Sequence, residues 1–289
     1  MQSPPISQAE IDARIHGHID ELLELWWAEQ GTSKSKDLEL IALAIPFPRS
    51  QAIRALDLCC GPGDVGRAIR RVYTKAHIDC IDRDPFLTSI CAEMNRREGI
   101  PGTLVVRDLK DDGWRDELPG NYDVVAMVNA LHWFSAERAA QLVLDVYATL
   151  RDNGLFLLVE PACPETPFMS GFEEWKAAQP PRYTRENWER FLARANELLG
   201  YDHTTLLGPR ANGNRIGDGM AVAGWIRLLE HAGFELVDVL LRDADQVVIG
   251  ALKSSIPGES KERGGQRTSL AKANSTRERS KRAEFGVLI

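Results

Sequence analysis

Residues Ala55–Gly66 read ALDLCCGPGDVG, an apolar run that passes directly into a glycine-rich turn. The glycines at positions 61, 63 and 66 fit the spacing G-x-G-x-x-G. This pattern predicts a strand, a tight turn and a helix, with glycines where a Cβ would collide with a bound ligand. The motif alone is a weak signal, because several nucleotide-binding folds share it.

Two carboxylates beside this turn narrow the choice of ligand. Asp82 lies 19 residues beyond Gly63, at the end of the next predicted strand, where a carboxylate can accept hydrogen bonds from ribose hydroxyls. Asp57 lies just upstream of the glycines, and a carboxylate is costly next to a pyrophosphate but useful to an ammonium group. Asp82 suits a ribose in either class of ligand, so it is Asp57 that favours a ligand with an ammonium group over a dinucleotide.

Outward from the turn, strands and helices alternate, which predicts a parallel sheet. The last two strands are separated by only Asp243–Asp245, too short for a crossover, so they are predicted to pair antiparallel. The expected fold is α/β, a Rossmann-like seven-stranded, mostly parallel sheet with an antiparallel closing strand. The predicted strands are Ala55–Leu58, His77–Ile81, Thr103–Val106, Tyr122–Val128, Leu155–Glu160, Phe234–Leu241 and Gln246–Leu252, and the helices between them are Val65–Lys75, Pro85–Met94, Ala136–Leu150, Arg185–Leu199 and Met220–His231.

Five segments in this order resemble the motifs of class I S-adenosylmethionine-dependent methyltransferases. They are Ala55–Gly63, Ile78–Asp82 (IDCID), Val105–Leu109 (VVRDL), Tyr122–Phe134 (YDVVAMVNALHWF) and Gly154–Glu160 (GLFLLVE). The resemblance covers about Gln51 to Lys253. One departure is Cys59, which stands where the family has its first glycine.

The resemblance implies S-adenosyl-L-methionine as cofactor and a role for each matched position. Asp57 and the Gly61–Gly63 backbone would hold the methionine moiety, Asp82 the ribose and Asp108 the adenine amino group, with Leu109 against the ring; an ordinary capping aspartate is the alternative for Asp108. Asn129 would line the methyl-transfer end. The full set of implied cofactor-binding residues is Asp57, Cys60, Gly61, Gly63, Asp82, Arg83, Asp108, Leu109 and Asn129.

Methyl transfer needs a base only when the acceptor must lose a proton, and His132 is the candidate catalytic residue. The alternative is that Leu131-His132-Trp133 forms a packed corner. Glu160 and Tyr183 are weaker candidates. The five cysteines show no ligand spacing, so reduced, mostly buried thiols and no metal site are expected.

Three domains are expected. Residues 1–50 form an N-terminal helical region, with one helix from a capping box at Ser7 to Gly31 and a short second one over Asp37–Ala44. Residues 51–253 form the cofactor domain, in which 161–219 is either a cap over the acceptor or a helical decoration with its own core. Residues 254–289 form a basic, disordered tail. The N-terminal helix could also cover the pocket with Trp26 or Trp27.

Composition limits the function. The net charge of the 289 residues is -7, although nine Lys and Arg face four Glu from Lys253 onward, so the body is acidic and poorly suited to nucleic acid. An amino-methyltransferase of nucleic acid would also carry Asp/Asn-Pro-Pro-aromatic after the fourth strand, where Asn129-Ala130-Leu131-His132 stands. No apolar run approaches a membrane span and no signal peptide is recognisable, so a cytoplasmic location is expected.

The predicted function is methylation of an O, N or C nucleophile of a small molecule. Two alternatives remain open: a non-catalytic S-adenosylmethionine-binding or partner protein, and an NAD-dependent oxidoreductase. The sequence identifies neither the acceptor nor the oligomeric state.

Overall fold

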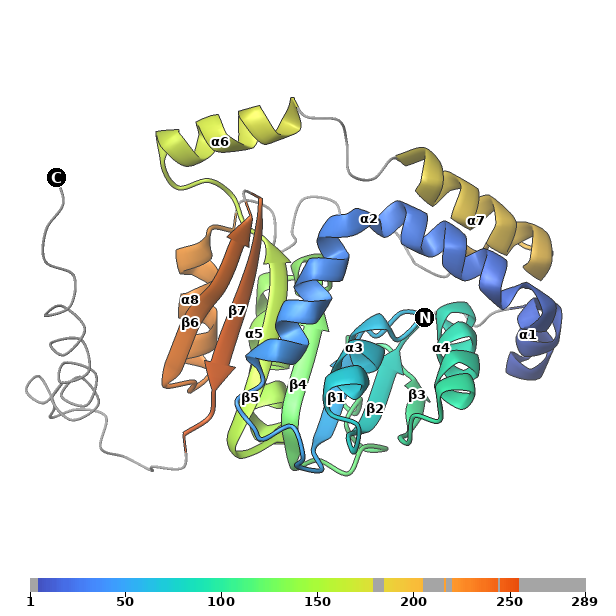
Figure 1. The fold of residues 1–289 in the computed structure, drawn as a ribbon, viewed down its shortest axis with the longest axis horizontal. Helices are drawn as coiled ribbons and strands as arrows, with labels where there is room; N and C mark the ends of the chain where they lie inside the picture. Colours follow the sequence, from blue (N-terminus) through green and yellow to red (C-terminus); the bar gives the residue numbers. More distant parts are fainter. Residues whose placement is uncertain (1–4, 179–184, 205–215, 217–219, 244, 255–289) are drawn as a thin grey trace, which may run out of the picture. The chain divides into compact units, whose positions relative to one another are not determined.

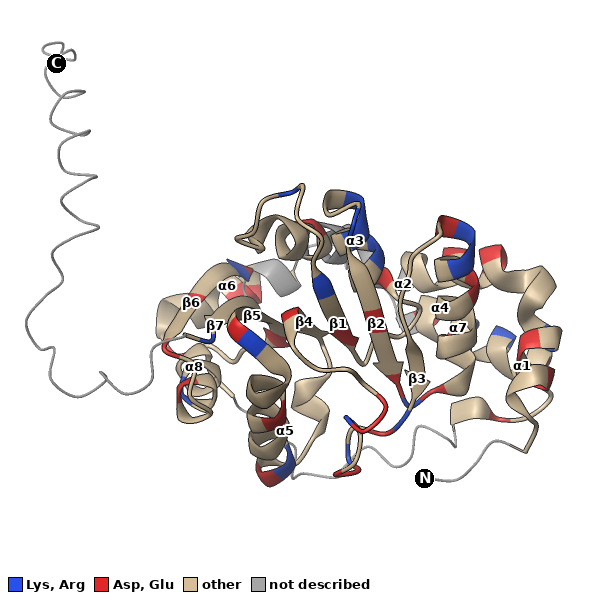
Figure 2. Cartoon of the chain, turned by 90° about the horizontal axis from the view of Figure 1, so that it is seen from below, with Lys and Arg blue, Asp and Glu red and all other residues tan. Residues whose placement is uncertain are grey.

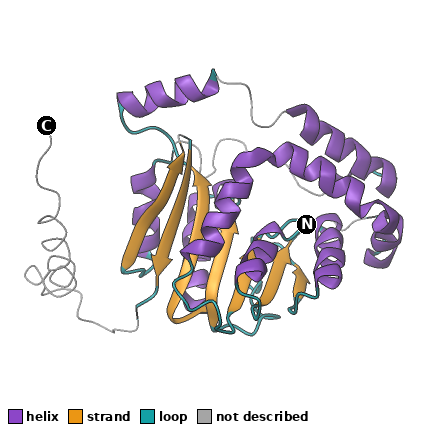
Figure 3. Cartoon of the chain, in the orientation of Figure 1, coloured by secondary structure: helices purple, strands orange, loops and turns teal. Residues whose placement is uncertain are grey.

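The fold is built on one sheet of seven strands (Figures 1 and 3). The computed structural model describes residues 5–178, 185–204, 216, 220–243 and 245–254. The strand order is β3-β2-β1-β4-β5-β7-β6, in which β7 runs antiparallel to both of its neighbours and the other strands run parallel. The strands are β1 Arg54–Leu58, β2 His77–Asp82, β3 Leu104–Val106, β4 Tyr122–Val128, β5 Leu150–Pro161, β6 Leu236–Asp243 and β7 Gln246–Leu252. The predicted mostly parallel sheet with an antiparallel closing strand is confirmed.

Both faces of the sheet are covered, which explains why its central strands are apolar throughout. In β4, Val125 and Met127 belong to the core on one face, while Val124 and Ala126 belong to the core on the other. Successive side chains of a strand point to opposite faces, so a strand buried on both sides reads as a continuous apolar run.

Helices supply the two layers. α5 (Ala136–Thr149) and α8 (Val222–His231) cover one face, and α3 (Asp64–Val72) and the C-terminal end of α2 (Ile19–Ala44) cover the other. α4 (Pro85–Glu98) joins a third cluster of buried side chains at the β2–β3 end of the sheet. The other helices of this cluster are α1 (Gln8–Ile15), α2 and α7 (Arg185–Leu199). The parallel strands thus all present their carboxyl ends, and the loops that follow, at one edge.

The N-terminal region differs from the expected pair of helices. α1 (Gln8–Ile15) begins at the predicted Ser7 cap, a 3-10 turn spans His16–His18, and α2 then runs unbroken from Ile19–Ala44. The predicted helix end at Gly31 is therefore wrong. A glycine inside a helix costs only about 1 kcal/mol, and α2 packs against both α3 and α7, which offsets that cost.

The insertion after β5 contains two helices in its described part. α7 (Arg185–Leu199) is the predicted one, whereas α6 (Pro167–Ala177) was not predicted. Buried side chains of α7, among them Phe191 and Leu199, pack with α1, α2 and α4. The α6 aromatics Phe168, Phe172 and Trp175 are exposed.

α1 and α2 belong to the same compact unit as the sheet, while the predicted domain boundaries at residues 50 and 253 stay predictions. Within the described residues, no helix is both long and apolar enough to cross a bilayer. The predicted tail falls outside the described residues except for Ser254.

Candidate active site

The glycine turn after β1 has a backbone that only small residues fit well. Gly61 (φ 52°) and Gly63 (φ 83°) lie in the left-handed region, and Gly63 is the N-cap of α3. A Cβ on Gly63 would lie 2.6 Å from the sulfur of Cys91, closer than real contacts allow. The predicted strand, turn and helix are therefore present, and the turn has no room for a side chain at Gly63.

Cys59, the departure from the family pattern, also has a positive φ of 53°. The left-handed region costs a residue with a Cβ roughly 1–2 kcal/mol, which explains why a glycine is the usual residue there. The Cys59 side chain is partly exposed.

Asp57 stands behind the turn. Its carboxylate is almost fully buried and accepts a hydrogen bond of 3.0 Å from the backbone N–H of Gly66. Burial raises the pKa of Asp57 well above its usual value. Asp57 thus fixes the first turn of α3, and its direct contact with a ligand ammonium stays a prediction.

Asp82 closes the turn from the neighbouring strand. Its Oδ2 accepts from the Gly61 N–H and its Oδ1 from the Asp84 N–H, both at 2.9 Å. Burial raises the pKa of Asp82 to about 6. Each carboxylate oxygen has a second lone pair, so Asp82 retains the capacity to accept from ribose hydroxyls.

The segment that carries Asp108 and Leu109 lies next to Asp82, because the Arg107 N–H donates a hydrogen bond to the carbonyl of Asp82. Arg83 follows Asp82 directly in the sequence. Asp108 accepts from the Lys110 N–H at 3.0 Å and lies 3.7 Å from the guanidinium of Arg83. The hydrogen bond from the Lys110 N–H is the kind that a capping aspartate makes, which is the alternative interpretation of Asp108. Leu109 is almost fully buried in the core, so its contact with an adenine ring stays a prediction.

Asn129 follows β4, one strand from the glycine turn. It adopts a positive φ of 52°, which asparagine tolerates better than most residues. Its side-chain oxygen accepts from Gln246 at 2.9 Å, so a residue of β7 fixes its orientation.

His132 is held by a buried carboxylate. Its Nδ1 lies 2.6 Å from Oε2 of Glu160, which is fully buried at the end of β5. Glu160 also accepts from the backbone N–H groups of Ala130 and Leu131, at 3.1 and 2.7 Å. With Nδ1 occupied, Nε2 has no hydrogen-bond partner among the described residues. A histidine with one nitrogen fixed by a carboxylate and the other open is the arrangement of a general base.

Comparisons with known proteins agree with this geometry. Residues 55–154, about a third of the chain, match the family model described as a methyltransferase domain. The chain contains a methyltransferase domain. A search of curated protein sequences found no match.

Solved structures show the fold of this methyltransferase domain at low identity. A Nostoc punctiforme protein assigned to the O-methyltransferases is 18% identical, with a TM-score of 0.51 over 75% of this chain and 56% of its own. An O-methyltransferase family protein from Burkholderia thailandensis is 14% identical, with 0.51 over 76% and 56%. Human N-acetylserotonin methyltransferase in complex with SAM is 16% identical, with 0.50 over 83% and 58%. The chain therefore spans less than two thirds of the length of these structures.

Trp26 of α2 lies over the glycine turn of the methyltransferase domain. Its indole N–H donates to Asp64 at 2.8 Å, and its ring lies 3.6 Å from where a Cβ of Gly61 would stand. Trp27 donates to the other oxygen of Asp64 at 3.1 Å. Sequence periodicity left open which tryptophan covers the turn, and the structure brings Trp26 to it.

His203 was not predicted. Its Nε2 lies 2.8 Å from Asp84, whose other oxygen caps α4 through the Phe86 N–H, and both side chains are buried. The pair fixes the segment that follows α7 to Asp84, which lies two residues from Asp82. A lone histidine in a loop carries no sequence signal for such a contact.

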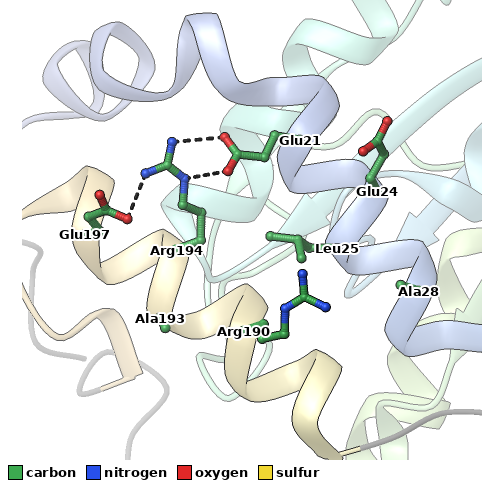
Figure 4. A pocket seen from close by; sticks show the side chains of 8 residues that line it. All are labelled: Glu21, Glu24, Leu25, Ala28, Arg190, Ala193, Arg194 and Glu197. Atoms are coloured by element: carbon green, nitrogen blue, oxygen red, sulfur yellow. Dashed lines mark hydrogen bonds and ion pairs between the residues drawn. The ribbon is translucent and has the colours of Figure 1, made fainter.

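A groove of about 570 Å³ lies between α2 and α7 (Figure 4). Arg194 spans it in ion pairs with Glu21 and Glu197. No predicted cofactor residue lines it, so the groove lies outside the candidate site.

Tyr183, the remaining candidate for the catalytic base, falls outside the described residues.

Proposed function

We propose that the protein transfers a methyl group from S-adenosylmethionine to an oxygen, nitrogen or carbon nucleophile of a small molecule. The observation that carries the proposal is the proximity of two features. Asp82 accepts a hydrogen bond from the glycine turn that follows β1. His132, which follows the neighbouring strand β4, has an Nε2 without a hydrogen-bond partner among the described residues. Both belong to a methyltransferase domain. The same fold carries N-acetylserotonin methyltransferase, whose structure contains SAM, which supports the same donor here.

The residues of the turn fit this cofactor. Gly61 and Gly63 form a cradle without side chains, and Asp82 is a nearly buried carboxylate with acceptor capacity left. We infer that the Gly61–Gly63 backbone, Asp82, Asp108 and Asn129 would hold it, with Arg83 orienting Asp108 and Trp26 covering the turn. When bound, S-adenosylmethionine supplies a methyl group on an electrophilic sulfonium.

The protein then has two tasks, to orient the acceptor and to remove its proton. His132 would accept that proton at Nε2. Glu160 would hold Nδ1 as the protonated nitrogen and stabilise the imidazolium that forms. This pair favours an acceptor that loses a proton during the reaction.

A small acceptor fits the charge distribution better than a nucleic acid. In Figure 2, Lys and Arg are interspersed with Asp and Glu over the described helices and loops. Recognition of a phosphate backbone instead requires Lys and Arg gathered in a patch or stripe. A cytoplasmic location stays a prediction, and the five free cysteines agree with the reducing conditions of that compartment.

The cofactor assignment is tested by calorimetric titration with S-adenosylmethionine, S-adenosylhomocysteine and NAD in parallel. Binding of the two adenosyl ligands in the micromolar range, without binding of NAD, is expected. Binding of NAD alone would favour the oxidoreductase alternative. Binding of the adenosyl ligands without turnover in a broad acceptor screen would favour a non-catalytic protein.

Asp82→Ala is expected to weaken S-adenosylmethionine binding at least tenfold, since hydrogen bonds to a charged group contribute about 1.5–3 kcal/mol. Asp238→Ala, on the exposed edge strand β6, is the matched control and should bind as wild type. Because Asp82 also holds the N–H groups of Gly61 and Asp84, thermal unfolding of each variant should accompany the titration. Unchanged affinity in folded Asp82→Ala would refute the assignment of the ribose site.

A further inference from the structure

Three buried cysteines meet beneath the glycine turn. Cys60 follows β1, Cys80 lies on β2 and Cys91 lies on α4, and their sulfur atoms are all within 4.8 Å of one another. Their exposed fractions are 7%, 1% and 0%. The sequence separates them by 20 and 11 residues, so no ligand-spacing pattern announces the cluster.

Rigid elements hold the three sulfur atoms in place. β2 pairs in register with β1, and the Cys60 N–H donates to the carbonyl of Ile81 at 3.1 Å. Cys91 lies on the 14-residue helix α4, against the face of Gly63 that lacks a Cβ. The cluster is thus fixed by the sheet, by the turn and by a helix capped at Asp84.

The spacing suits a trigonal metal centre. The centre of a triangle with 4.8 Å sides lies at most about 2.8 Å from each corner, and metal–sulfur bonds of this kind are about 2.3 Å long. Each sulfur would therefore move by about half an ångström or less. A movement of that size is within reach of χ1 rotation.

A buried guanidinium lies beside the cluster. The Cβ position of Gly63 is 2.6 Å from the Cys91 sulfur and 3.5 Å from a guanidinium nitrogen of Arg67, so a positive charge lies near the thiols. The Asn95 amide also donates to the Cys91 sulfur at 3.6 Å. Arg67 is itself buried, and ion pairs with Asp64 and Glu98 hold it in place.

We propose that Cys60, Cys80 and Cys91 form a three-thiolate site for a soft, monovalent d¹⁰ cation of the Cu(I) class. Thiolates select soft cations, whereas structural zinc sites take four ligands. No fourth His, Cys, Asp or Glu of the described chain belongs to this group. On binding, each thiol exchanges its proton for a bond to the metal, and the displaced protons pass to solvent.

The site has a consequence for the turn above it. The metal would link β1, β2 and α4 at the base of the Gly61–Gly63 turn, so it should raise the melting temperature and limit the motion of that turn. The inference rests on the cysteine geometry and not on the proposed methyl transfer.

The test uses the full chain, purified reduced and without oxygen, and titrated with Cu(I) supplied from a chelator complex. Bound metal is counted by elemental mass spectrometry, and thiolate-to-metal charge-transfer absorption reports the ligands. Wild type is expected to bind one Cu(I) per chain and to melt at a higher temperature with it. Cys80→Ala should lose at least tenfold in affinity, while Cys163→Ala, which changes a cysteine outside the cluster, should bind as wild type.

Three results would overturn the proposal: no stoichiometric Cu(I) in wild type, equal affinity in Cys80→Ala, or Zn(II) displacing Cu(I). A disulfide between two cysteines of the cluster, found in protein purified under reducing conditions, would also overturn the proposal. If Cys80→Ala does not fold, Cys91→Ser gives the same comparison. The metal count needs neither cofactor nor turnover, so its failure leaves the proposed function untouched.

Discussion

His132→Ala should lower turnover by about 10²–10⁴-fold, the usual contribution of a positioned general base, while S-adenosylmethionine binds as in wild type. The variant removes Nε2, the nitrogen left open when Glu160 holds Nδ1 at 2.6 Å. The measurement is steady-state turnover across pH, with an acceptor from the screen and a cofactor titration beside it.

Two further variants make this result specific. Glu160→Gln keeps the size of the side chain but removes the charge that orients the imidazole, so turnover should fall. His16→Ala changes an exposed histidine outside the site and should leave turnover unchanged. Wild-type turnover of His132→Ala at neutral and high pH alike would remove His132 as a base and favour the packed-corner interpretation.

The sheet could be predicted from local pattern because each strand carries its own signal. β4 and β7 have the predicted bounds, Tyr122–Val128 and Gln246–Leu252. Their apolar runs are bounded by residues that end a strand. The short connection around Asp243–Asp245 also predicted that β6 and β7 pair antiparallel, which is confirmed.

Predictions failed where contacts between distant segments outweigh local preference. β5 begins at Leu150 instead of Leu155, because Leu150 pairs with Tyr122 of β4 ahead of a register shift. Asn153 and Gly154 also exchange hydrogen bonds with Lys253 across the predicted turn. α2 continues through Gly31 for the same reason, since packing against other helices exceeds the cost of one glycine.

The candidate site was predictable as a set of positions but not as a set of contacts. Parallel strands bring Asp57, Asp82 and Asp108 to one edge of the sheet, whatever their separation in sequence. The hydrogen bond between Glu160 and His132 joins residues 28 positions apart in the sequence. The three clustered cysteines likewise come from three different structural elements. Such pairings leave no periodic signal, so they become visible only in three dimensions.

Gly102→Ala is expected to be the most destabilising substitution in the sheet. Gly102 has a φ of +154°, and a Cβ there would lie 1.6 Å from the carbonyl oxygen of Ile78. The flanking residues hold it against β2, since Ile78 N–H donates to Pro101 and Cys80 N–H to Thr103, both at 2.8 Å. The clash is with backbone, so relieving it would separate β3 from the beginning of β2. A loss above about 4 kcal/mol is expected, the range reserved for severe core or backbone defects.

Thermal and denaturant unfolding followed by circular dichroism measure this loss. Gly120→Ala is the matched control, because Gly120 also has a positive φ, +69°, but no atom lies within 4 Å of its Cβ position. The control should cost only about 1 kcal/mol, the penalty of the left-handed conformation itself. Equal melting temperatures for the two variants would show that β3 can leave β2 without loss of the fold. The Asp82 end of the site would then rest on a strand less firmly held than its hydrogen bonds indicate.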